Sequence, residues 1–446
     1  MPEISPAEII RRFADRAEFR KLVQAKTVTE TESVVGTSLT EYLFGPHHRN
    51  LAAIGLHAIV VSPDSGYSAM PLPAEFAKQF SNLYKHAEVE PGKFQQVLHE
   101  GVLLLYTAGF APVVVELKRV EKGLWLRVFT RSEQAELGRQ LVEGVKYYCQ
   151  EKNTLRGRKI DPQGRFLKIG KCSWDDLVVP EEIKQYLQND VAGFVQKLEQ
   201  YRKFGLKTKR GILLSGSPGT GKTLSARVLA NEVDCTLIWV TPRDLADPGK
   251  VRDIYRMARD LAPSIVLFED ADLYALDRQS GNRSAIMGEL FNTLDGLEEL
   301  EDVLTVMTTN HPEQLERALV DRPGRFDNEI EFPLPDRNLA LLMVKRFTQR
   351  YELTKFDNQT WDAIGNILAG LSGSHIYEVV KRATIRAIDS RMVQANRLQV
   401  PLSFILDAAR DVRDKHEANS KRFELVDIPD APAPVLRSAS RSESEG

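Results

Sequence analysis

Five short apolar runs follow one another between residues 211 and 334, and stretches with the period of an amphipathic helix separate them. The runs read GILLS, TLIWV, SIVLFED, VLTVMTTN and NEIEFPL. Strands that alternate with helices in this way indicate a parallel sheet with helices on both faces, because each parallel connection must cross over the sheet. We therefore predict an α/β core over residues 174–335.

The segment before this core, residues 1–152, has a mixed pattern. A capping box at Ser5 predicts a helix start, VVVELK and LWLRVF around RVEKG predict a β-hairpin, and the period of residues 132–152 predicts a helix. The most apolar stretch, residues 101–115, is interrupted by glycine and proline and is shorter than the roughly 20 residues that a membrane helix needs. We predict an α+β N-terminal domain without membrane contact.

Three further segments complete the predicted organisation. A polar, basic stretch makes residues 153–173 a linker between the N-terminal domain and the core. Residues 336–420 have helical periodicity throughout and predict a small all-helical lid domain, with Asp336 as the N-cap of its first helix. Residues 421–446 are rich in Pro, Ser and Ala, lack periodicity and are predicted to be disordered.

Composition narrows the classes of function. The 446 residues carry 60 basic and 62 acidic side chains, a net charge of −2, which lacks the basic excess of a dedicated duplex binder. The three cysteines, Cys149, Cys172 and Cys235, are odd in number and have no CxxC spacing. They argue against a disulfide framework and against a cysteine metal site, and they fit a reducing compartment such as the cytoplasm.

The loop after the first apolar run, GSPGTGKT, fits the phosphate-binding pattern GxxxxGK[ST] at Gly216, Gly221, Lys222 and Thr223. Glycines let the backbone curl so that successive N–H groups point at phosphates, and the following helix adds its positive dipole end. Lys222 is expected to reach the β- and γ-phosphates of a nucleotide, and Thr223 to hold Mg²⁺. A simple glycine-rich turn is the alternative, but the position between a strand and a helix favours the phosphate loop.

The third apolar run ends in acidic residues. Glu269 and Asp270 follow the strand directly, and Asp272 comes next. An open parallel sheet binds its ligands at the carboxyl ends of its strands. A nucleotide-hydrolysing site needs one carboxylate for Mg²⁺ and another group to orient the attacking water, so these acids are candidates for both tasks. A pair of solvated acids after a strand is the alternative.

These motifs, in this order, resemble the AAA ATPases. The resemblance runs from SWDDLVVPEEIKQYL to about residue 418 and rests on RGILLSGSPGTGKT, APSIVLFEDAD, LFNTLDGL, VMTTNHPEQLERALVDRPGRFD and GLSGSHIYEVVKRA. It implies a P-loop NTPase fold, ATP and Mg²⁺ as ligands, ATP hydrolysis, and assembly into a ring that is usually a hexamer.

The resemblance also implies roles for individual residues. Asn310 resembles the sensor residue that positions the attacking water. Arg322 and Arg325, in DRPGRFD, resemble the arginine fingers that reach into the neighbouring subunit's site, although the sequence alone would be interpreted as a turn. The residues expected to contact the nucleotide are Gly216, Ser217, Pro218, Gly219, Thr220, Gly221, Lys222, Thr223, Leu224, Val179, Gly373 and Ser374.

The chain departs from the family pattern at three places. Most of the family ends the acidic strand in Asp-Glu, whereas this chain has Glu269-Asp270, an order similar to the branch of the mitochondrial translocase of the folded Rieske protein. By register, Glu269 takes the magnesium role and Asp270 the role of polarising water. Val178-Val179-Pro180 replaces the usual hydrophobic-Gly pair near adenine. The loop after the second strand, VTPRDLADPGKVRDIY, has DPGK where family unfoldases carry an aromatic pore residue.

Three functional hypotheses remain. The first is a ring that remodels protein clients, which the N-terminal domain recognises. The second is a nucleic-acid-linked ATPase of a DNA-processing or defence system, for which binding would weaken steeply with salt. The third is an ATP-gated assembly scaffold, for which turnover would be very low and assembly would depend on ATP.

Overall fold

A computed structural model describes residues 37–45, 49–61, 67–70, 82–107, 113–120, 123–151, 153–245, 247–275, 282–295, 301–313, 315, 328–355, 357–394 and 397–424. The helix start predicted at Ser5 lies outside the described residues. The described chain forms two compact units, the first within residues 1–217 and 221–332, the second within residues 218–220 and 333–446. No helix among the described residues is both long and apolar enough to cross a bilayer.

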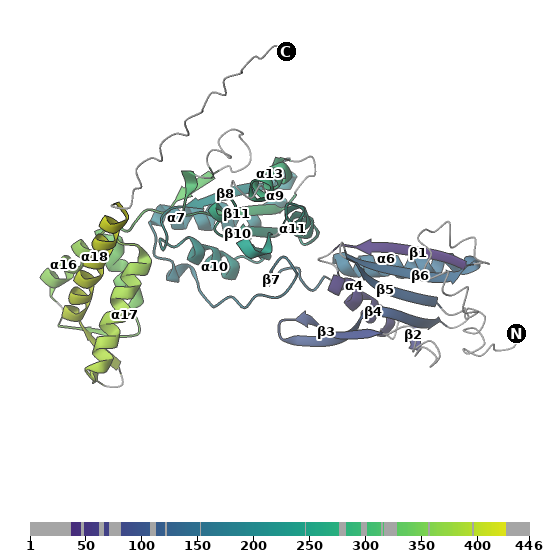
Figure 1. Cartoon of the computed structure of the whole chain (residues 1–446), viewed down its shortest axis with the longest axis horizontal. Helices are drawn as coiled ribbons and strands as arrows, with labels where there is room; N and C mark the ends of the chain where they lie inside the picture. The colour runs from purple at the N-terminus through teal and green to yellow at the C-terminus, as the bar shows by residue number, and fades with distance from the viewer. Residues whose placement is uncertain are drawn as a thin grey trace, which may run out of the picture. The chain divides into compact units, whose positions relative to one another are not determined.

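The N-terminal part of the first unit is an antiparallel sheet with two helices (Figure 1). Its strand order is β1-β6-β5-β4-β2, and β3 pairs with β4. The strands are β1 (Thr37–Phe44), β2 (Tyr67–Met70), β3 (Leu83–Glu90), β4 (Lys93–Thr107), β5 (Val113–Val120) and β6 (Gly123–Arg131). The predicted hairpin is the β5–β6 pair, in which Val120 lies opposite Gly123.

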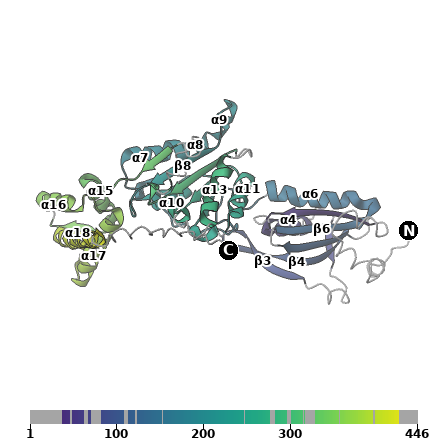
Figure 2. The same ribbon diagram turned by 45° about the horizontal axis from the view of Figure 1, so that its top comes forward.

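Helices α4 (Arg49–Val61) and α6 (Ala135–Glu151) contact each other and the sheet, and α6 runs alongside β1 and β6 (Figure 2). The helix predicted over residues 132–152 is α6, preceded by a 3-10 turn at Ser132–Gln134. The most apolar stretch of the chain forms the end of β4 and the start of β5 rather than a helix. The α+β N-terminal region therefore matches the pattern of the sequence.

The core of the first unit is a parallel sheet of the order β12-β8-β11-β10-β9-β7. The strands are β7 (Lys159–Ile160), β8 (Arg210–Ser215), β9 (Thr236–Val240), β10 (Ser264–Phe268), β11 (Val303–Thr308) and β12 (Asn328–Glu331). The five predicted runs supply β8 to β12. Because β11 lies between β8 and β10, the ends of these three strands are neighbours.

Helices cover both faces of this sheet, as predicted. The helices are α7 (Glu181–Tyr186), a π-helical turn (Leu187–Ala192), α8 (Gly193–Gln196), α9 (Leu198–Lys203), α10 (Lys222–Glu232), α11 (Gly249–Asp260), α12 (Asp272–Ala275) and α13 (Asn282–Asp295). Ile212 and Leu214 of β8 share a buried cluster with Leu229 of α10. Leu213, which points to the other face, belongs to a cluster with Tyr255 of α11 and Leu290 of α13.

The segment predicted as a linker contributes to this core sheet. Within residues 153–173, strand β7 pairs in parallel with β9, and Ile160 is fully buried. A strand of two residues is too short to produce an alternating pattern, so the surrounding polar residues dominate the sequence signal. The Lys159 ammonium donates to the carbonyl oxygens of Val233 and Cys235 at 2.9 and 2.8 Å, which holds the edge strand in place.

The second unit is helical but not entirely so, which corrects the all-helical expectation. Its helices are α15 (Arg337–Phe347), α16 (Asn358–Leu368), α17 (Gly373–Asp389) and α18 (Leu402–Glu424). A small sheet of the order β13-β15-β14 joins them, from strands β13 (Glu352–Thr354), β14 (Val393–Gln394) and β15 (Arg397–Pro401). These strands are two to five residues long, too short to interrupt the helical period on either side.

The two ends of the second unit bear on the predicted N-cap and on the predicted tail. Asp336 is the N-cap of α15, and its carboxylate accepts a hydrogen bond from the backbone N–H of Leu339 at 2.7 Å. Helix α18 continues to Glu424, four residues beyond the predicted end of the lid at residue 420, so the first four residues of the predicted tail are helical. The remainder of the tail, residues 425–446, lies outside the described residues.

Candidate functional site

The loop between β8 and α10 has the backbone of a phosphate cradle. Gly216, Gly219 and Gly221 all have positive φ angles, of 136°, 77° and 115°, a region that costs other residues energy. At Gly216 a Cβ atom would also lie 2.5 Å from the carbonyl oxygen of Phe332. The loop leads into α10, an 11-residue helix that begins at Lys222, so the first amides of the helix face the loop.

Lys222 lies inside this loop. Its side chain is buried, and its ammonium donates to the carbonyl oxygens of Gly216 and Ser217 at 2.6 and 2.9 Å. Burial lowers the pKa of Lys222, while the nearby carboxylates of Asp270 and Asp272 act in the opposite direction. An ammonium in this position, close to both the loop and the acidic strand, has the charge and reach to bind a phosphate oxygen.

Glu269, directly after β10, is held by hydrogen bonds to both of its carboxylate oxygens. The hydroxyl of Thr223 donates to Oε1 at 2.9 Å, and the indole N–H of Trp239 donates to Oε2 at 3.1 Å. Trp239 is next to the last residue of β9, the strand that pairs with β10. The hydroxyl of Thr223 and the carboxylate of Glu269 form a set of hard oxygen donors of the kind that Mg²⁺ prefers, so these residues fit the ion.

Asp270 has an unusual backbone and a perturbed side chain. Its φ angle is +50°, in the left-handed region that few residues other than glycine adopt. Its backbone N–H donates to the hydroxyl of Thr308 at 3.0 Å, and its Oδ1 lies 3.4 Å from the amide nitrogen of Asn310. Burial and the charges of Glu269 and Asp272 raise the pKa of Asp270, against the opposing effects of Lys222 and Asn310. A carboxylate with raised proton affinity is suited to general-base catalysis.

Asp272 connects the acidic strand to the loop after β11. Its side chain is buried, and its Oδ1 accepts hydrogen bonds from the hydroxyl of Thr309 and the backbone N–H of Asn310, each at 3.0 Å. This contact fixes the start of the loop that carries Asn310. The carboxylate of Asp270 and the side chain of Asn310 therefore face each other from neighbouring strands.

The remaining residues of the predicted site fall into three groups. Val179 is buried beside the phosphate loop, because its Cγ1 would lie 3.4 Å from a Cβ atom at Gly221, and Leu224 packs on the same apolar cluster. In the second unit, the backbone N–H of Ser374 donates to the carbonyl oxygen of Gly219 at 3.3 Å, and a Cβ atom at Gly373 would lie 3.0 Å from that oxygen. Arg322 and Arg325 lie outside the described residues.

Two residues of the site, Trp239 and Asp272, make contacts that the sequence does not predict. The sequence predicts that Trp239 is a packing residue, since tryptophan at the end of an apolar run is usually part of a core. Only the pairing of β9 with β10 brings its indole to Glu269. Asp272 belongs to the acidic motif, but its contact with the loop after β11 depends on strand order, which the motif does not encode.

Comparison with known proteins agrees with this geometry. Residues 212–334 match the family described as ATPase family associated with various cellular activities (AAA). A yeast protein, the ATPase family gene 2 protein of Saccharomyces cerevisiae, is 31% identical over 232 residues, which are 50% of this chain and 30% of the yeast protein. The 26S proteasome regulatory subunit 8 homolog of Naegleria fowleri is 32% identical over 256 residues, 54% of this chain and 61% of that protein.

A third relative, the Cell division cycle protein 48 homolog of Archaeoglobus fulgidus, is 29% identical over 305 residues, 66% of this chain and 40% of that protein. The chain thus spans between 30% and 61% of the length of these three relatives. The family match covers the phosphate loop, the acidic strand and the strand that precedes Asn310. Residues 212–334 are therefore similar to the ATPases of the AAA family.

Proposed function

We propose that the chain binds ATP with Mg²⁺ and hydrolyses it to ADP and phosphate. The observation that carries the proposal is the convergence of Lys222, Glu269, Asp270 and Asn310 at the ends of β8, β10 and β11. In this reaction water attacks the γ-phosphorus, the bond from that phosphorus to the bridging oxygen breaks, and the water loses a proton.

Each group has a distinct task in this reaction. Asp270 orients the attacking water and accepts its proton, and the amide of Asn310 fixes the direction of that carboxylate. Lys222 exchanges its carbonyl partners for phosphate oxygens. Thr223 and Glu269 would hold Mg²⁺, which, when bound, neutralises charge on the phosphates. The swapped order of the acidic pair, similar to the Rieske-protein translocase branch, makes Glu269 the longer of the two side chains, and Trp239 compensates by fixing its Oε2.

We further propose that the chain acts as a homo-hexamer that remodels proteins or protein complexes in the cytoplasm. Arg322 and Arg325 would complete the site of the neighbouring subunit, as the family resemblance implies. A protein client is favoured over nucleic acid because the net charge is −2 and because one relative is named as a regulatory subunit of the proteasome. The segment Thr241–Pro248 between β9 and α11 contains no aromatic residue, so gripping of an extended polypeptide by an aromatic side chain is not part of this proposal.

A client-trapping experiment tests this proposal. Tagged Asp270→Asn protein, held in excess ATP in its native cell, would be purified and its partners identified by mass spectrometry. Lys222→Ala is the control, because it removes the ammonium needed to bind ATP. Enrichment of one protein with Asp270→Asn alone supports the remodelling function. Enrichment of nucleic acid instead, with binding that weakens steeply with salt, would favour the nucleic-acid hypothesis. Enrichment of neither, together with assembly that depends on ATP, would favour a scaffold.

A further inference from the structure

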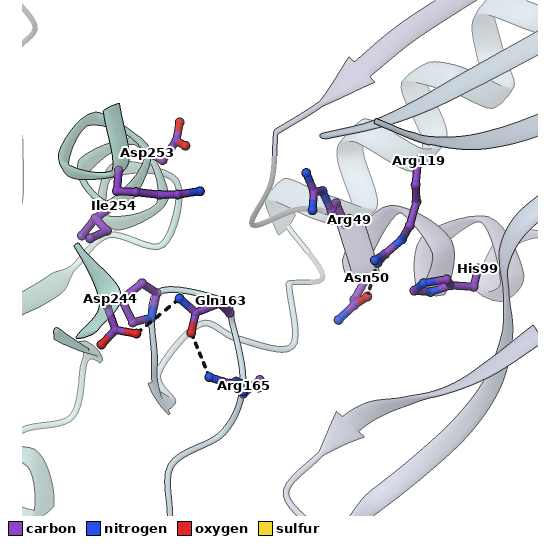
Figure 3. A pocket seen from close by; sticks show the side chains of 11 residues that line it. Arg49, Asn50, His99, Arg119, Gln163, Arg165, Asp244, Asp253 and Ile254 are labelled. Carbon is purple, nitrogen blue, oxygen red and sulfur yellow. Dashed lines mark hydrogen bonds between the residues drawn. The ribbon is translucent and has the colours of Figure 1, made fainter. Parts of the chain in front are cut away.

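Side-chain hydrogen bonds often do no more than join neighbouring elements. Figure 3 shows an example, in which Arg119 of β5 donates to Oδ1 of Asn50 in α4 at 3.0 Å. One hydrogen bond at the edge of the core sheet is different, because it involves Asp270. The hydroxyl of Thr308, the last residue of β11, accepts a hydrogen bond from the backbone N–H of Asp270 at 3.0 Å. Thr308 is therefore a candidate for a role in the reaction, although the sequence predicts only a strand at this position.

Thr308 contacts the chain after β10 at two successive residues. Its hydroxyl accepts from the N–H of Asp270, and its carbonyl oxygen accepts from the N–H of Ala271 at 2.8 Å. The preceding amide, that of Glu269, donates in the other direction, to the carbonyl oxygen of Val240 in β9 at 3.0 Å. In a regular strand successive amides point to alternate neighbours. The chain therefore turns at Asp270 and brings two amides in succession to Thr308.

This turn depends on an unfavourable backbone conformation. The φ angle of Asp270 is +50°, in the left-handed region that costs energy for a residue with a Cβ atom. Such a conformation persists only where the surrounding contacts determine it. Thr308 supplies these contacts, because its hydroxyl and its carbonyl oxygen hold the amides on both sides of the α-carbon of Asp270. Without the hydroxyl, the N–H of Asp270 would lose this acceptor, and the backbone would be free to rotate.

Thr308 also connects the backbone of Asp270 to Asn310. Its side chain is buried, and it lies two residues before Asn310 in the same segment. Oδ1 of Asp270 is 3.4 Å from Nδ2 of Asn310, so a rotation of Asp270 would change this contact directly. The hydroxyl of Thr308 thus determines how the carboxylate of Asp270 is placed relative to the amide of Asn310.

We propose that Thr308 is a positioning residue for ATP hydrolysis. Its hydroxyl holds the left-handed backbone of Asp270 and so directs the carboxylate toward the attacking water. This role rests on the proposed ATPase function, and Thr308 acts through Asp270 rather than on the nucleotide itself. A displacement of about 1 Å can slow a reaction by about 10²-fold. Loss of the hydroxyl should therefore slow the chemical step and leave ATP binding unchanged.

Single-turnover ATP hydrolysis and ATP affinity of three threonine variants test this role. Thr308→Val keeps the shape of the side chain and removes the hydroxyl, so we expect hydrolysis slowed by about 10–100-fold with unchanged ATP affinity. Thr308→Ser keeps the hydroxyl and should keep most of the wild-type rate. Thr305→Val is the matched control, because Thr305 is another buried threonine of β11, and its hydroxyl is hydrogen-bonded to that of Tyr255 at 2.9 Å. This control also loses a buried hydrogen bond but should hydrolyse ATP at the wild-type rate.

A double-variant cycle separates positioning from a general loss of stability. If Thr308 acts through Asp270, then Thr308→Val should have little further effect on hydrolysis in a chain that already carries Asp270→Asn. A purely structural role would slow the double variant by the full factor again. Thr308→Ala, which adds no atoms, takes the place of Thr308→Val if circular dichroism shows that the valine variant is not folded, and the same results are expected.

The outcomes distinguish the positioning role from the function on which it rests. Hydrolysis by Thr308→Val at the wild-type rate, or an equal loss of rate in Thr308→Ser or Thr305→Val, would overturn the positioning role. A loss of ATP affinity as large as the loss of rate would also overturn it, because the nucleotide site itself would then be disturbed. A wild-type chain that neither binds nor hydrolyses ATP would instead overturn the proposed ATPase function, and the role of Thr308 with it.

Discussion

Replacement of Trp239 tests whether its indole N–H positions a carboxylate of the site. Trp239→Phe removes the hydrogen bond to Oε2 of Glu269, while the bond from Thr223 to Oε1 remains. A hydrogen bond to a charged group contributes about 1.5–3 kcal/mol. Because Glu269 is only partly buried, a hydrogen bond from water can compensate for part of the lost stabilisation. We therefore expect a net effect near the low end, about 1.4 kcal/mol, which is a ten-fold change in an equilibrium constant.

The expected result is a roughly ten-fold weaker apparent affinity for Mg²⁺, since groups that orient metal ligands typically affect metal affinity by about this factor or more. The assay is Mg²⁺ titration of the binding of a fluorescent ATP analogue, followed by Mg²⁺ titration of turnover. Trp361→Phe is the matched control, because Trp361 has nearly the same exposure, 8% against 9%, and lies in the second unit. A Trp239→Phe protein that is folded and has the wild-type Mg²⁺ midpoint would refute the positioning role.

Three further predictions address the loop, the general base and the assembly. Gly216→Ala should lower the free energy of unfolding by about 1–3 kcal/mol, because φ is positive there and the new Cβ would meet the Phe332 carbonyl. Gly205→Ala, where φ is +68° but the space around the Cβ is open, should lower the free energy of thermal unfolding by less. In the pH profile of kcat/KM, the midpoint of the acid limb should lie above the ordinary aspartate pKa of 3.8, because the pKa of Asp270 is raised and its carboxylate form is the active one. A midpoint at or below pH 3.8 would contradict this role of Asp270. Arg325→Ala should lose turnover but keep ATP affinity, and mixing it with Lys222→Ala should restore some turnover if the arginine acts in the neighbouring site.

The sequence predicted the parts of this molecule whose signal is local. The phosphate loop is one continuous motif, and strands β8 to β12 are apolar runs long enough to recognise. Strand β7 and the small sheet of the second unit were not predicted, since their sequences, KI, ELT, VQ and RLQVP, are short and mix polar with apolar residues, so that none forms a continuous apolar run. Their formation depends on tertiary pairing, such as that of β7 with β9.

The same distinction applies to the site. Lys222, Thr223, Glu269 and Asp270 could be chosen from motifs alone. The contact of Trp239 with Glu269 could not, because it joins residues 30 positions apart through the pairing of two parallel strands.

Asp270→Asn tests most directly whether Asp270 is the group that acts on the attacking water. The change keeps the shape of the side chain and removes its ability to accept a proton. Single-turnover ATP hydrolysis and ATP binding would be measured on the same preparation. We predict unchanged ATP affinity and hydrolysis slowed by about 10²–10⁴-fold, the usual contribution of a general base. Hydrolysis at the wild-type rate would contradict the assignment and would transfer the role to Glu269.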